Sequence, residues 1–255
     1  MHSRLCYNIE DINDKDINLK HKYESTLDEN FNRAFELCSS EHNYELLIDL
    51  LKTGNIPEKQ YSALFINELK SQEDAKIFIS NLVNCDGKIR EAVALKISEF
   101  IHIEQYREYF SNYPEIFAQS TIDINANISR IIIDSLVYLN DNPSFGGKYS
   151  KILQKYIQDA FDGLDKIIYR DKKYTINKQL FKLYWSLEGL YNYSQYIERS
   201  VLKDILEKTS NISEYTVREK AAKFLRKYKN EPMFVNLISK FEQDENYYVK
   251  SFFKQ

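Results

Sequence analysis

Apolar residues recur at steps of three and four along most of the chain from about residue 28, which is the spacing of one face of an α-helix. Tyr44, Leu47, Ile48 and Leu51 form one such stripe. No segment sustains the two-residue alternation of a strand. Residues 1–27 are polar and weakly periodic, which predicts a partly irregular N-terminal segment. We therefore expect an all-α protein with a single helical domain over residues 28–255.

The predicted helices fall into about six pairs. The second helix of each pair is expected to start near residues 57, 87, 126, 174, 215 and 247. Turn-forming residues punctuate the pattern, most densely over residues 140–147, where Asn140-Asp141-Asn142-Pro143-Ser144-Phe145-Gly146-Gly147 predicts a loop. This loop is either a hinge between two halves of the chain or an ordinary longer connection between repeats.

A short peptide recurs at the start of two of these second helices. Ile89-Arg90-Glu91-Ala92-Val93-Ala94 returns as Val217-Arg218-Glu219-Lys220-Ala221-Ala222, and weaker copies begin at Ile128, Ile176 and Val249. An acidic residue precedes each copy: Asp86, Asp123, Asp171, Glu214 and Asp244. An acid near a helix start accepts backbone N–H bonds, and the arginine can pair with an acid of an adjacent repeat.

Asp86-Gly87-Lys88-Ile89-Arg90 and Glu214-Tyr215-Thr216-Val217-Arg218 resemble the second-helix signature of HEAT repeats. The irregular distances between the copies also suit HEAT or armadillo arrays, whose loops vary in length. The resemblance implies a right-handed α-α superhelix, a solenoid whose second helices line a concave face. It is weaker at Ile128, where Arg130 falls one step late, and at Ile176, where Asn177 replaces the arginine.

Composition excludes several classes of protein. The 255 residues carry a net charge of −3, which differs from the basic character of most dedicated nucleic-acid binders. The three cysteines are too few and too scattered for a disulfide framework, so we expect a reducing, cytoplasmic location. No apolar run is long enough to cross a bilayer, and we expect no membrane partner.

The sequence contains no recognisable catalytic or metal-binding constellation. Cys38 and His42 lie four residues apart, but two ligands do not make a zinc site. Phosphate-binding glycine motifs and nucleophile elbows are also missing. We therefore expect no cofactor, no metal and, on balance, no enzymatic activity.

Candidate binding residues lie on the predicted concave face. The helix from Tyr174 offers Phe181, Tyr184 and Glu188 opposite its apolar stripe, with Trp185 beside them. Exposed tyrosine and tryptophan are typical of binding hot spots; the alternative is that Phe181 and Trp185 pack against the next repeat. Arg130 and Asp134, four residues apart, could engage a ligand on the same wall, or simply form an ion pair with each other.

The helix over residues 217–229 is strongly basic. Its positive side chains are Arg218, Lys220, Lys223, Arg226, Lys227 and Lys229. They predict a basic ridge that could meet phosphate or an acidic partner, although a solvated helix face is the commoner outcome of such a run.

Three functions fit these features. The first is a non-catalytic scaffold that holds a peptide or protein partner on the concave face. The second follows from the resemblance, because HEAT-like arrays include alkylpurine DNA glycosylases, and it would give Trp185, Tyr184, Asp134 and Arg130 roles beside a damaged nucleotide. Nucleic acid is thus the less favoured partner. A chromophore-lyase subunit of HEAT type is a distant third.

Overall fold

The computed structural model describes residues 29–39, 43–165 and 173–254. Within these ranges every regular element is a helix, and no strand is present, which confirms the expected all-α class. A helix over residues 29–39 comes first. The others are α2 (Tyr44–Thr53), α3 (Ile56–Phe65), α4 (Gln72–Ser80), α5 (Gly87–Phe100), α6 (Glu104–Phe110), α7 (Pro114–Thr121), α8 (Ala126–Leu136), α9 (Pro143–Asp165), α10 (Lys173–Tyr191), α11 (Arg199–Thr209), α12 (Tyr215–Arg226), α13 (Val235–Glu242) and α14 (Tyr247–Ser251). Short 3₁₀ turns, η2 (Val137–Leu139), η3 (Ser194–Tyr196) and η4 (Pro232–Phe234), join some of them. The predicted N-terminal segment, residues 1–27, lies outside the described residues.

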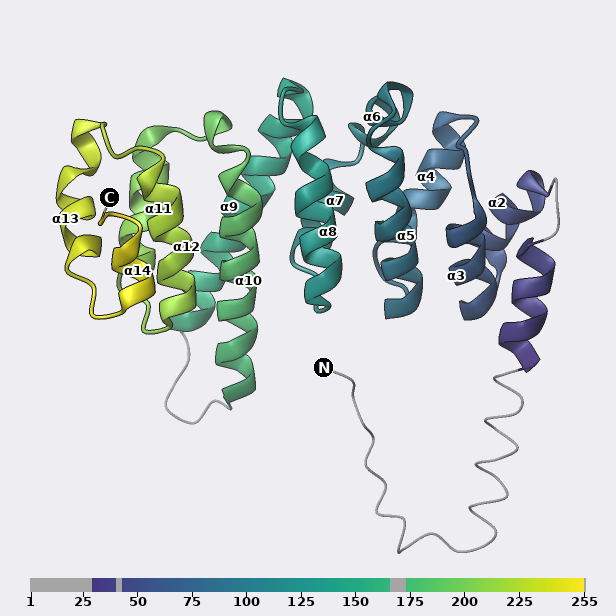
Figure 1. The fold of residues 1–255 in the computed structure, drawn as a ribbon, viewed down its shortest axis with the longest axis horizontal. Helices are drawn as coiled ribbons and strands as arrows, with labels where there is room; N and C mark the ends of the chain where they lie inside the picture. Colours follow the sequence, from purple (N-terminus) through teal and green to yellow (C-terminus); the bar gives the residue numbers. More distant parts are fainter. Residues whose placement is uncertain (1–28, 40–42, 166–172, 255) are drawn as a thin grey trace, which may run out of the picture.

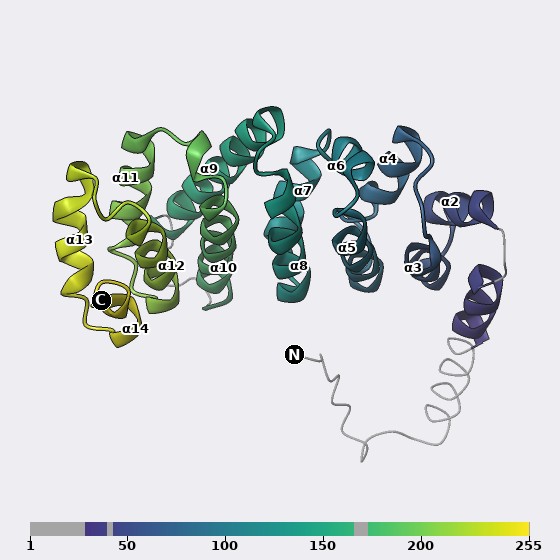
Figure 2. The same cartoon turned by 45° about the horizontal axis from the view of Figure 1, so that its top comes forward.

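The helices pair as the sequence predicted. The second helices, α3, α5, α8, α10, α12 and α14, each begin within one residue of the expected start. Successive second helices contact each other in chain order, from α3 to α14. Figure 1 shows the pairs following one another along the longest axis of the molecule. In Figure 2 the second helices line the inner side of a shallow arch and the first helices its outer side.

Side-chain caps explain where most second helices begin. Asn55 and Glu58 form a reciprocal capping box at α3, with Pro57 in the first turn. The Asp86 carboxylate accepts the Lys88 N–H at 2.8 Å at the start of α5. Such caps bind backbone N–H groups that have no partner within the helix. The polar residue before each apolar stripe therefore fixes the boundary.

One hydrophobic core runs the length of the array. Its buried members extend without a break from Cys38 to Val249 and include residues of every helix pair. Large aromatic side chains such as Phe78, Phe117, Phe145 and Phe234 are fully buried in it. Because each pair buries its apolar face against its neighbours, the whole array is one packing unit.

The loop predicted over residues 140–147 is wrong in its second half. Helix α9 already begins at Pro143, whose fixed backbone angle suits a first helical turn. The Asn142 side chain accepts the Phe145 N–H at 3.0 Å and so starts the helix. Gly146 lies against the Tyr196 ring, so closely that any β-carbon would collide with it. The glycine therefore serves close packing inside a helix, and the connection is a short turn.

Candidate functional site

Two buried Arg–Asp bridges join neighbouring helix pairs. Arg90 Nε and Nη2 donate to the two oxygens of Asp123 at 2.6 and 3.0 Å, and Arg218 binds Asp244 in the same way at 2.7 and 3.0 Å. In each case the arginine of one second helix reaches the acid that precedes the next. This confirms the pairing between repeats that the recurring peptide predicted, and assigns it a structural role. The upstream acid Asp171 lies outside the described residues.

The bridges also fasten the turns around them. Arg218 Nη1 donates to the carbonyl oxygens of Ile212 and Ser213 at 2.9 and 2.8 Å. Burial alone would raise the pKa of Asp244, but the bound guanidinium and the Asn246 N–H outweigh burial and hold that pKa below its ordinary value. The carboxylate is therefore stable as an anion in a nearly closed site.

Four of the six basic side chains of the predicted ridge do not form a free cationic surface. Arg218 is only 6% exposed, and Asp244 neutralises it. Lys220 and Lys223 both bind the Glu188 carboxylate, at 2.9 and 2.7 Å. Lys227 donates to the Ser194 hydroxyl at 2.7 Å. These charges are committed to contacts between helices, because the run of lysines faces α10 and its following turn.

The junction between α8 and α10 differs from the bridged ones. Ser129 occupies the arginine position, and its hydroxyl donates to the backbone oxygen of Asp123 at 3.1 Å. At the other end of the junction, the Tyr193 hydroxyl donates to the Leu136 carbonyl at 2.5 Å, and the Tyr196 hydroxyl to the Asn140 carbonyl at 2.8 Å. Burial raises the pKa of the Tyr193 hydroxyl, which keeps it a donor. The two helices are therefore tied beyond their C-terminal ends.

A cavity of about 250 Å³ lies in this junction. It is lined by residues of α8, α10 and α12: Arg130, Ile133, Asp134, Tyr184, Trp185, Glu188 and Lys220. We call it the α8–α10 pocket. Five of the six binding residues predicted from the sequence line it, and Lys220 of the predicted ridge joins them. Phe181 does not; it is half-buried and packs edge-on against the Trp185 ring.

Trp185 is buried and forms a wall of the pocket. It is 7% exposed, which supports the alternative that it packs within the array and corrects the view of it as an exposed surface residue. Tyr184 meets its ring edge-on, with 5.0 Å between centroids. The indole N–H has no hydrogen-bond partner among the described residues, yet Nε1 is not one of the fully enclosed polar atoms. Trp185 lines the pocket, and its indole N–H is a hydrogen-bond donor that no described residue uses.

Arg130 and Asp134 are exposed at the pocket and do not pair. The ion pair expected from their four-residue spacing is not formed, and neither side chain bonds to another residue in the described ranges. Glu188 is the opposite case. Burial opposes its ionisation, but hydrogen bonds from Lys223 and Lys220 outweigh burial and hold the pKa of its carboxyl below the ordinary value. The pocket thus has a fixed charged floor and two unpaired charged side chains.

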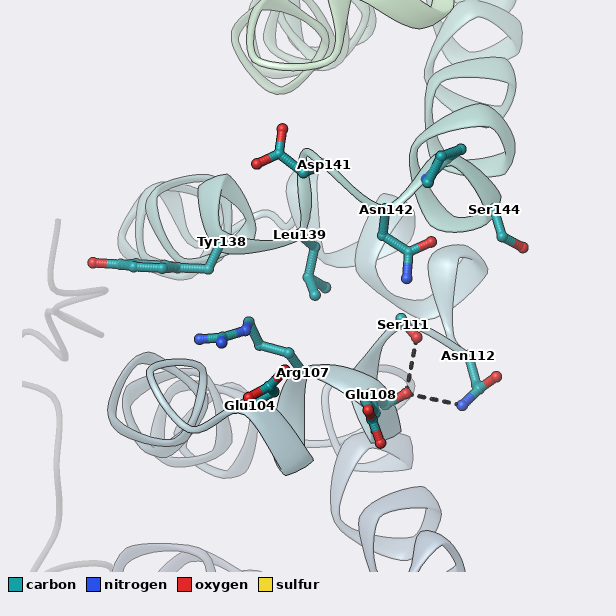
Figure 3. Close-up of a pocket in the computed structure, with 11 residues that line it drawn as sticks. Glu104, Arg107, Glu108, Ser111, Asn112, Tyr138, Leu139, Asp141, Asn142 and Ser144 are labelled. Carbon is teal, nitrogen blue, oxygen red and sulfur yellow. Dashed lines mark hydrogen bonds between the residues drawn. The ribbon is translucent and has the colours of Figure 1, made fainter.

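A larger but shallower cavity, of about 840 Å³, lies between α6 and the turn before α9 (Figure 3). No sequence motif indicated it, since its residues come from helix ends and turns. Arg107 there donates to the carbonyl oxygens of Ile101 and His102, and Asn112 and Ser111 donate to the backbone of Glu108. Its exposed acids are Glu104, Glu108 and Asp141. This cavity is the larger of the two. We nevertheless take the α8–α10 pocket as the candidate site, because the unpaired side chains of Arg130, Asp134 and Trp185 line it.

Comparison of the chain with protein-family models, with curated proteins and with solved structures found no match. In the described part of the chain, no three histidine, cysteine or acidic side chains come together as a metal site. Cys38 is buried against the Ser62 hydroxyl at 3.4 Å, and His42 lies outside the described residues. None of the described helices combines the length and apolar character needed to cross a membrane.

Proposed function

We propose that this protein is a non-catalytic interaction module, a right-handed α-α superhelix of HEAT type that binds a peptide or protein partner on its concave face. The order of the helix pairs, the arch of second helices and the two Arg–Asp bridges support this architecture. The bridges match the role that the HEAT resemblance assigns to the recurring arginine. The proposal places the partner on the inner side of the arch, at the α8–α10 pocket.

One observation carries the proposal: unpaired polar groups of α8 and α10 converge on one cavity. Arg130, Asp134 and the Trp185 N–H have no partner among the described residues, and all three side chains line the same pocket. Arg130 and Asp134 are exposed and therefore accessible to a ligand, and a cavity on which a few polar groups converge is the usual form of a binding site. A segment of another protein that enters the arch would supply hydrogen-bond partners for these groups.

The alternative of a DNA-binding repair protein receives less support. Phosphate recognition relies on a continuous surface of free cations. Here Arg130 and Lys220 line the pocket together with Asp134 and Glu188, and the nearby lysines are held by Glu188 and Ser194. The mixed charge favours a dipolar protein ligand over a phosphate backbone. No contact in the pocket favours a chromophore-lyase subunit.

Selection from a displayed library of random peptides tests the proposal. We expect the wild type to enrich related sequences, and Arg130→Ala/Asp134→Ala to lose them. These two side chains are exposed, so their removal leaves the fold intact; Trp185 is buried and unsuitable for this purpose. Arg33→Ala/Asp49→Ala, which removes exposed side chains far from the pocket, should retain binding. Failure to enrich any peptide, or equal binding by both double variants, would overturn the proposal.

A second arm of the experiment addresses nucleic acid. Fluorescence anisotropy with a generic DNA duplex should show no binding at moderate salt and none at low salt. Phosphate contacts dominate protein–DNA affinity and strengthen as salt falls. Salt-sensitive binding that is lost in Arg130→Ala would favour the repair alternative.

A further inference from the structure

The unpaired groups of the α8–α10 pocket define the chemistry of what can fill it. The Arg130 guanidinium and the Trp185 N–H are donors, whereas the Asp134 carboxylate is an acceptor. Glu188 and Lys220 also line the pocket but already bind each other at 2.9 Å. A complementary ligand must therefore offer an acceptor to the first two groups and a donor to the third.

The size of the pocket limits the ligand to one residue or a similar group. Its volume of about 250 Å³ is below the range of about 300–1,000 Å³ that is typical of sites for whole small molecules. The pocket is lined by residues of α8, α10 and α12, and these second helices lie on the inner side of the arch in Figure 2. The pocket is thus suited to one anchoring side chain of a longer segment that lies along the arch.

We propose that the α8–α10 pocket binds a side-chain carboxamide, that of glutamine or asparagine, from the partner peptide. This inference rests on the proposed function and adds the identity of the anchor. The amide oxygen accepts hydrogen bonds from Arg130 and Trp185, and the amide NH₂ group donates to Asp134. Both ends of the dipolar group are then satisfied.

The competing side chains each leave a pocket group unpaired. A carboxylate accepts from Arg130 but offers no donor to Asp134, and it brings a third anion beside Asp134 and Glu188. A lysine or arginine pairs with Asp134 but leaves Arg130 and the Trp185 N–H without an acceptor. A ligand that matches the donors and the acceptor of the pocket gains hydrogen bonds that the competing side chains cannot form. The pocket should therefore prefer a carboxamide over a carboxylate or a basic side chain.

Contacts among the residues that line the pocket hold its aromatic side chains in place. Lys220 lies over the Tyr184 ring, 4.6 Å from its centroid, while its ammonium group binds Glu188. Tyr184 in turn packs edge-on against Trp185. The position of the indole N–H is therefore fixed before a ligand enters, which lowers the entropy lost on binding.

Nuclear magnetic resonance can test this inference directly, because Trp185 is the single tryptophan of the chain. Its indole gives one ¹H–¹⁵N signal that reports on the pocket. The probes are N-acetyl N-methylamides of glutamine, glutamate, lysine and alanine. We expect the glutamine derivative to shift the signal saturably, with a Kd on the order of 1 mM for so small a ligand. The other three should bind at least about tenfold more weakly.

Variants complete the test. Arg130→Ala and Asp134→Ala should each abolish the saturable shift, whereas the matched exposed controls Arg33→Ala and Asp49→Ala should retain it. Absence of a saturable shift, tighter binding of the glutamate or lysine derivative, or binding that survives in both pocket variants would overturn the inference. Displayed peptides that need Arg130 and Asp134 but contain no anchoring glutamine or asparagine would overturn the inference alone and leave the proposed function standing.

Discussion

The bridged junctions and the α8–α10 junction solve the same packing problem in different ways. Between α5 and α8, and between α12 and α14, an arginine that is largely shielded from solvent holds the acid before the next helix with two hydrogen bonds. Between α8 and α10, Ser129 stands at the arginine position, and tyrosine hydroxyls beyond the C-terminal ends of the helices make the contact. The middle of that junction stays open and contains the pocket.

We propose that the two kinds of junction have different roles, the bridged ones in the stability of the array and the α8–α10 junction in binding a partner. Arg90 and Arg218 are enclosed, and their charges are balanced within the protein. Arg130 lies one residue later in its repeat, at an exposed position without a partner in the described ranges. A shift of one position on a helix turns a side chain by about 100°, which moves it from the inter-repeat contact to the open face. We infer that the repeat supports the array and that its irregular copy supplies the proposed binding site.

The largest expected effect is the loss of a bridge. Arg218→Ala leaves the Asp244 carboxylate without its counter-ion in a largely buried site, where, among the described residues, only the Asn246 N–H still binds it, and it also releases the carbonyl oxygens of Ile212 and Ser213. Removal of one partner from a buried ion pair costs about 3–5 kcal/mol. We expect a loss of this size in the free energy of unfolding, measured by urea titration. Arg90→Ala should follow the same trend.

Arg130→Ala is the matched control for this prediction. The same type of residue is removed from a second helix, but at an exposed and unpaired position, so the change should stay within about 0.5 kcal/mol. Equal destabilisation by Arg130→Ala and Arg218→Ala would contradict the division between bridged and open junctions.

Smaller effects are expected at two adjacent glycines of α9, and their replacement by alanine should change the stability in opposite directions. Gly146→Ala places a methyl group against the Tyr196 ring, on the side of the junction that the tyrosines hold, and should cost about 1–3 kcal/mol. Gly147 has open space around it within α9, so Gly147→Ala should stabilise by about 0.5–1 kcal/mol through helix propensity. Thermal unfolding measures both. A neutral or destabilising Gly147→Ala would indicate that this segment is not helical.

A further predicted effect concerns Glu188, which lines the pocket, and it depends on pH. Glu188→Gln loses the ion pairs with Lys220 and Lys223, which should cost about 1 kcal/mol near pH 7. Because the folded-state pKa of Glu188 is lowered, its contribution is present above the unfolded value of about 4.3 and is lost as pH falls through the folded value. Wild type and variant should therefore converge in unfolding free energy as pH falls below the folded-state pKa of Glu188. A difference that does not change with pH would contradict this role of Glu188.

The sequence was most informative where a local rule decides the outcome. Capping residues such as Asp86 and Glu214 fix helix starts, and the repeated arginine and upstream acid indicated which charges meet. Packing between distant segments was harder to predict. The closeness of the Tyr196 ring to Gly146 could not be inferred from a run of turn-forming residues, and α9 was expected too late for that reason.

The site was predicted in its residues but not in their roles. Helical spacing correctly put Arg130, Asp134, Tyr184 and Glu188 on faces that meet. It could not show that the Trp185 side chain is buried. Adjacent positions of a helix point in different directions, and only the packing of the other helices decides which of them is covered. The charge count of residues 217–229 was also misleading, since a count cannot show that Glu188 and Asp244 approach from other repeats.

Ligand-induced stabilisation tests the central claim most directly. The free energy of unfolding is measured with and without a display-selected peptide for the wild type, Arg130→Ala and Arg218→Ala. At a free peptide concentration of about 100 times the wild-type Kd, binding should add about 2.7 kcal/mol. We predict this full gain for the wild type and for the less stable Arg218→Ala, and almost none for Arg130→Ala. A gain retained by Arg130→Ala, or lost by a folded Arg218→Ala, would contradict the claim that the bridges stabilise the array while the open junction binds the partner.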